Sequence, residues 1–109
     1  MQLPRRLMFA LVILPLLNAA TAAAAPPPLG RWASAGGNVL VVNDDATCAY
    51  QTPTLKVQGT CSWQAGQSDG ILYIDYQSTP QSPLQRMDVH VRWIDRANIV
   101  VLGEAFHRR

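Results

Sequence analysis

Charged side chains and the residues that catalysis and metal binding need are scarce in this sequence. Charged residues make up 15% of the chain, and there are two cysteines and two histidines, His90 and His107. No Cys-x-x-Cys pair, phosphate-binding glycine loop, calcium loop or nucleophile elbow occurs. We therefore predict no catalytic residue, no cofactor-binding residue and no metal ligand, which favours a protein that is not an enzyme.

An excess of positive charge is also missing once the first residues are set aside. Arg5 and Arg6 precede an apolar run over 7–17, and a stretch of small residues over 19–25 offers cleavage positions, as in a secretory signal peptide. Without these two arginines the basic and acidic side chains are equal in number, so nucleic acid is not an expected partner. We expect 1–25 to be a signal peptide and the protein to be periplasmic or secreted. The apolar run is too short to cross a membrane, so no span is expected after cleavage.

Helical periodicity is absent beyond the signal peptide, and two-residue alternation takes its place. Residues 26–29, which include three consecutive prolines, are expected to form an extended arm. Residues 30–109 then form one small domain. Runs of alternating residues bounded by turn residues predict about seven strands, over 30–34, 38–42, 47–51, 55–64, 71–77, 86–94 and 99–109.

These strands follow one another through short connections, which predicts an all-β, antiparallel, up-and-down meander. A sheet of this size avoids exposed edges best by curling until its first and last strands meet. We therefore expect a small barrel or half-barrel.

Both cysteines lie within the hairpin predicted for 47–64. If Cys48 lies opposite Cys61, the same register places Tyr50 opposite Gly59, and the cysteines share the apolar face. Because an exported protein meets oxidising conditions, we expect a disulfide between the two cysteines. In a domain this small, such a bond would contribute about 3 kcal/mol.

Short motifs recur in order along the domain. They are Gly30-x-Trp32, Val39 to Asn43 followed by an acidic turn and Thr47, Gly59-Thr60, Ile71 to Ile74 after a glycine-containing loop, and Phe106-x-Arg108. Together they resemble the small bacterial lipocalin-like domains of the calycin group. This resemblance implies that Trp32 closes one end of a barrel and that Arg108 stacks on it, a cation–π contact of about 0.5–1 kcal/mol.

The chain also resembles, more weakly, the periplasmic inhibitors of secreted metalloproteases. These are exported barrels with one disulfide, a Gly-x-Trp near the start and an N-terminal arm that enters the protease cleft. The resemblance implies that Pro26, Pro27, Pro28 and Leu29 form a partner-binding arm. A proline-rich arm of this kind would lose little conformational entropy on docking.

Two binding roles follow for this exported module. One is a small apolar ligand in the barrel mouth, contacted by Tyr50, Trp63 and Trp93. The other is an exported protein partner, with inhibition of a secreted protease or other hydrolase through the arm as the alternative. Nothing in the sequence indicates a cofactor or an oligomeric state.

Overall fold

The structure, a computed structural model, describes residues 23–109. The predicted signal peptide lies outside the described residues except for its last three positions. Eight strands follow one another along the described part of the chain. Their bounds are β1 Gly30–Ser34, β2 Val39–Val42, β3 Thr47–Gln51, β4 Lys56–Ala65, β5 Asp69–Tyr76, β6 Gln85–Asp95, β7 Asn98–Val101 and β8 Glu104–Arg108.

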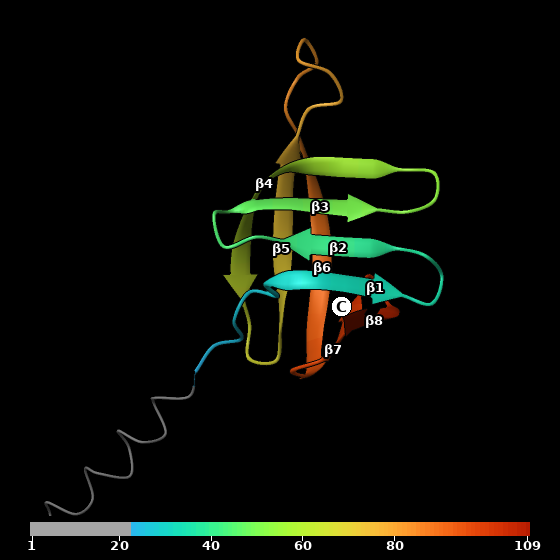
Figure 1. The fold of residues 1–109 in the computed structure, drawn as a ribbon. Helices are drawn as coiled ribbons and strands as arrows, with labels where there is room; N and C mark the ends of the chain where they lie inside the picture. The colour runs from blue at the N-terminus through green and yellow to red at the C-terminus, as the bar shows by residue number, and fades with distance from the viewer. Residues whose placement is uncertain (1–22) are drawn as a thin grey trace, which may run out of the picture.

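Each strand pairs with the next in antiparallel fashion, and β1 also pairs with β8. Strands β1 to β3 run across β5 and β6 (Figure 1). The strongly bent β4 starts beside β3 and ends beside β5, and so joins these two groups of strands. The pairing of β1 with β8 closes the sheet into a barrel, so each described strand pairs with a neighbour on both sides. This confirms the predicted all-β meander and its closure. Within 23–109 no helix could span a membrane.

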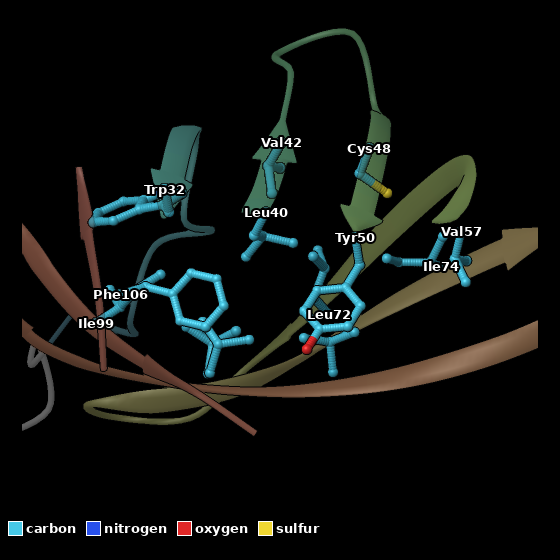
Figure 2. Close-up of a cluster of buried hydrophobic side chains, with 13 residues drawn as sticks. Trp32, Leu40, Val42, Cys48, Tyr50, Val57, Leu72, Ile74, Ile99 and Phe106 are labelled. Atoms are coloured by element: carbon cyan, nitrogen blue, oxygen red, sulfur yellow. The ribbon is translucent and has the colours of Figure 1, made fainter. Parts of the chain in front are cut away.

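The barrel interior is filled by the apolar side chains that alternation points inward. Trp32 of β1, Leu40 of β2 and Phe106 of β8 are completely buried (Figure 2), and burial of this size is the main favourable term in folding. Strands β2 and β3 also contribute Val42, Cys48 and Tyr50, and strands β4 to β7 contribute Val57, Leu72, Ile74, Val89, Val91, Ile99 and Val101. A core this full leaves the barrel axis occupied by protein.

The prediction of one long strand over 99–109 was wrong. The chain turns at Leu102 and Gly103, whose φ angles are 51° and 83°, and β7 pairs with β8 across this turn. Positive φ at both central residues is typical of the two-residue turns that match the twist of a hairpin. The apolar alternation continues into Leu102 and therefore hid the turn.

The predicted register of the cysteine hairpin was also wrong, by two residues. Cys48 lies opposite Gly59 and Tyr50 opposite Val57, while Cys61 donates its backbone N–H to Ala46 O at 2.9 Å. The two cysteines are therefore diagonal neighbours, a relation that places Cα atoms about 7–8 Å apart, too far for a disulfide without backbone movement. Both are free thiols in this structure.

Two glycines explain how β5 packs so closely against β4. A Cβ atom on Gly59 would lie 1.9 Å from the backbone oxygen of Asp75, so only glycine fits there. A Cβ atom on Gly70 would lie 2.4 Å from Cζ2 of Trp63. The ring of Trp63 therefore covers Gly70, an arrangement that stabilises glycine in a sheet.

Candidate functional site at the arm end of the barrel

The connections of the meander alternate between the two ends of the barrel. One end consists of residues 25–29 and the turns at 43–46, 66–68 and 96–97, and we call it the arm end. The opposite end, the loop end, carries the turns at 35–38, 52–55 and 102–103 and the longer loop at 77–84. Figure 1 shows the 77–84 loop projecting away from the barrel.

The proline-rich arm lies against the barrel at the arm end, where all three tryptophans of the chain hold it. Each indole donates its N–H to a backbone carbonyl of the arm. Trp63 Nε1 donates to Ala25 O at 2.8 Å, Trp93 Nε1 to Pro26 O at 2.8 Å, and Trp32 Nε1 to Pro28 O at 3.0 Å. Because the donors come from β4, β6 and β1, the arm crosses the opening of the barrel and ties strands from different parts of the sheet together.

The backbone groups of the arm are all satisfied. Leu29 donates its N–H to Pro27 O at 2.9 Å and accepts at its own carbonyl from Arg108 Nη1 at 2.9 Å. Ala25 donates its N–H to Gly66 O at 2.8 Å. The three prolines have no N–H to satisfy, so five consecutive carbonyls find donors and no N–H of 25–29 is left without an acceptor.

The conformation of the arm follows from its prolines. Proline fixes φ near −65°, and a residue before proline is restricted to extended ψ, which places Pro26 and Pro27 in the polyproline II region. Pro28 is followed by Leu29 and is free to form the three-residue turn that the Leu29 N–H to Pro27 O bond closes. Ala25 and Pro28 are buried, whereas the two residues between them are exposed, the three-residue period of a polyproline helix.

Arg108 joins the arm to the end of the chain. Its guanidinium carbon lies 4.1 Å from the centroid of the Trp32 ring, and its Nε donates to Arg96 O at 2.9 Å. Trp93 packs edge-on against the same ring, with centroids 5.6 Å apart. Trp32 is thus covered by a cation on one side and an aromatic edge on another, which fixes the indole that binds Pro28.

A hollow of about 200 Å³ lies beside the arm. Pro27 and Leu29 form one wall, Trp63 and Cys61 of β4 form another, and the turn with Asp44 forms the rim. Its volume is below the roughly 300–1,000 Å³ typical of small-molecule sites. A hollow of this size has room for about one apolar side chain.

Tyr50, Trp63 and Trp93 do not surround a common cavity. Tyr50 lies in the packed interior toward the loop end, 7% exposed, and burial, helped by the charge of Glu104, raises the pKa of its phenol. Trp63 and Trp93 lie at the arm end, where the arm occupies their N–H groups. The three residues predicted as ligand contacts are therefore divided between the core and the arm.

At the loop end, Asn38 Nδ2 donates to Glu104 Oε1 at 2.7 Å, across the space between β2 and β8. The 77–84 loop has internal bonds of its own, such as Gln77 Nε2 to Ser82 O at 2.9 Å. Leu84 at its end is 67% exposed. This end is thus built from side-chain contacts and an exposed loop, without a docked segment.

The two thiols lie between the core and the hollow. Cys48 is buried and Cys61 is partly exposed. Burial is the main cause that raises the pKa of both thiols. Both are therefore neutral at pH 7, and since the thiolate is the reactive form, neither is an activated nucleophile.

The docking of the arm was missed in the sequence, although a signal for it is present. Three consecutive prolines supply carbonyl acceptors without competing donors, and three tryptophans supply N–H donors that need partners when buried. Matching the two groups would have suggested that they bind each other.

Comparison with protein-family models, with curated proteins and with solved structures gives no match for this chain. The class of protein is therefore defined by the structure itself. It is a closed, eight-stranded antiparallel barrel, compatible with a lipocalin-like barrel, with one end covered by a proline-rich arm.

Proposed function

We propose that this chain is an exported, lipocalin-like binding module without enzymatic activity and that it binds a protein partner at its arm end. One observation carries the choice of partner: the interior is packed with side chains, such as Leu40 and Phe106, that are completely buried. A small apolar ligand would need a site in that interior. A protein partner needs only an accessible surface, and the arm end supplies one, with the hollow beside the arm and the three indole donors that the arm covers.

Cross-linking in the exporting host tests this proposal. We take the signal peptide to be cleaved at one of the earlier positions within 19–25, so that Ala24 and Ala25 stay in the mature chain. A photoreactive amino acid replaces Ala24, which is exposed at the arm end, or Leu84, its matched control at the loop end. We expect one exported protein to be cross-linked from position 24 and not from position 84. Cross-linking from position 84 alone would contradict the assignment of the arm end.

Native mass spectrometry of the mature protein, purified from that host, tests the competing role of a ligand carrier. We expect the mass of the unliganded chain. A small molecule retained by the folded protein, together with an absence of cross-links, would replace the proposed partner by a small ligand.

Inhibition of a secreted protease is the second candidate, and the fixed position of the arm favours it. Ala25 is held through both its N–H and its carbonyl, so the exposed residues before it would be presented to a cleft from a fixed point. Deletion of 23–24 removes that presented segment and leaves the buried Ala25 and Pro28 in place. We expect this deletion to abolish inhibition at unchanged melting temperature; unchanged inhibition would exclude the mechanism.

A further inference from the structure

The arm end has the chemistry of a site that recognises an extended proline-rich peptide. Such sites combine aromatic walls with donors aimed at the carbonyls of a polyproline II segment. Here Trp63, Trp93 and Trp32 supply both features, and they bind carbonyls of an Ala-Pro-Pro-Pro segment. We call this group of three tryptophans, together with Arg108, the indole cradle. In this structure the chain's own arm fills it.

The contacts of the arm with the cradle depend on backbone carbonyls rather than on arm side chains. Pro26 and Pro27 are exposed, and only Ala25 and Pro28 are buried. Any segment that places small or proline residues at these two buried positions, and carbonyls at the same spacing, makes the same bonds. The cradle therefore selects a conformation, which proline supplies at low entropic cost.

The junction between arm and barrel has the freedom that exchange requires. Gly30, the first residue of β1, has a φ angle of 113°, a conformation that glycine adopts readily and other residues rarely do. Since residues 23–29 belong to no strand, the arm can leave the barrel by rotation about Gly30 while the ladder of β1 with β2 and β8 stays paired.

We infer that the indole cradle is a binding site for an extended proline-rich segment of the partner protein, and that the chain's own arm occupies it as an intramolecular competitor. This inference rests on the proposed function, because it names the part of the partner that docks at the arm end. Binding of the partner would release the arm and place the partner's prolines against the same three indoles.

The test uses the full mature chain with a loosened arm. Replacing Pro26→Gly and Pro27→Gly removes the conformational restriction at two exposed positions and leaves the buried Pro28 and the cradle unchanged. The ligand is the synthetic peptide Ala-Ala-Ala-Pro-Pro-Pro-Leu-Gly. The readout is the set of three indole N–H signals in a ¹⁵N-correlation spectrum, one from each tryptophan. Well-dispersed amide signals and a retained melting transition show that the variant is folded.

We expect the peptide to shift all three indole signals in a saturable manner in the loosened variant. In the unmodified chain, where the arm has the advantage of attachment, at least tenfold more peptide is needed. Replacing Trp63→Phe in the loosened variant keeps an aromatic ring and removes one donor, and it should weaken binding of the peptide about fivefold.

A peptide with Gly-Gly-Gly in place of Pro-Pro-Pro is the matched control and should bind at least tenfold more weakly. The inference is overturned if millimolar proline peptide leaves the indole signals unmoved, or if the glycine peptide binds equally well. Should the indole signals stay unmoved while position 24 still cross-links to a partner, the proposed function stands and only the proline-rich segment is excluded.

Discussion

The two ends of this barrel are closed by different means. At the arm end, backbone carbonyls of a proline-rich segment meet indole and guanidinium donors from four strands. At the loop end, side chains such as Asn38 and Glu104 meet one another, and an exposed loop extends beyond them. The comparison teaches that the arm end is held through a segment that can leave without unpairing the sheet, whereas the loop end is held only by the barrel itself.

The largest expected difference between the ends comes from removing their central contacts. Trp32→Ala removes a completely buried side chain together with its bond to Pro28, and should lower the free energy of unfolding by about 3–5 kcal/mol. Asn38→Ala at the loop end removes one bond to a carboxylate and should cost about 1.5 kcal/mol. Urea unfolding measures both losses of unfolding free energy, and equal losses would contradict the expected difference between the two ends.

The next effect concerns the two strand glycines. Gly59→Ala forces a methyl group against the backbone of β5, which cannot move aside, and should cost about 3 kcal/mol, the upper part of the range for overpacking. Gly70→Ala should cost less, because its nearest backbone atom, Gln64 O, lies 2.6 Å from the added methyl group rather than 1.9 Å and because the Trp63 ring can move.

A separate readout distinguishes these two variants at the arm end. Movement of the Trp63 ring breaks its bond to Ala25, so Gly70→Ala should shift the Trp63 indole N–H signal strongly, and Gly59→Ala should leave it in place. A shift in the Gly59 variant alone would contradict the described packing.

A smaller effect on the free energy of unfolding should appear at alkaline pH, because of the two thiols. Burial raises the pKa of Cys48 and Cys61 in the folded state, so their contribution to stability is complete below the pKa of an unfolded thiol, about 8.5, and is lost as the pH rises above it. Urea midpoints measured with reductant from pH 7 to 10 should fall. The fall should be shallower in a variant with Cys48→Ala and Cys61→Ala, and identical slopes would argue against buried neutral thiols.

The smallest expected effect on stability comes from an ion pair on the outer face of β5 and β6. Arg86 Nε donates to Asp75 Oδ1 at 2.7 Å, and this bond lowers the pKa of Asp75. Its contribution is present above the unfolded pKa of about 3.9 and is lost as the pH falls through the lower folded value. Replacing Asp75→Asn should slightly reduce the loss of stability between pH 4 and 2. In 1 M salt, which screens exposed charges, the difference in stability between the Asp75→Asn variant and the unmodified chain should shrink.

Sequence reasoning predicted the strands better than their pairing. Alternation reports which side of a strand faces the core, so β3 and β6 were predicted almost to the residue. It carries no information about which residues of two strands lie opposite each other, because a shift by two leaves every face unchanged. The expected cysteine pair failed for this reason: the true register moves Cys61 beyond the end of β3.

At the candidate site, individual residues were predicted more readily than their roles. The resemblance placed Arg108 over Trp32, and the structure has them in contact. Trp63 and Trp93 were interpreted as ligand contacts because aromatic residues on inward faces suggest a pocket. Their N–H groups are instead satisfied by the arm. The bonded residues are separated by 38 positions for Trp63 and by 67 positions for Trp93, so no local pattern reports these contacts.

The burial of Ala25 has a consequence for how far aminopeptidases can trim the N-terminus. An aminopeptidase needs a free, extended end that it can draw into its active site, and Ala23 and Ala24 are exposed. Ala25 has its N–H bonded to Gly66 and its carbonyl to Trp63, and the bond after it leads into proline. The barrel thereby protects its own N-terminus, so trimming from any upstream start is expected to stop at Ala25.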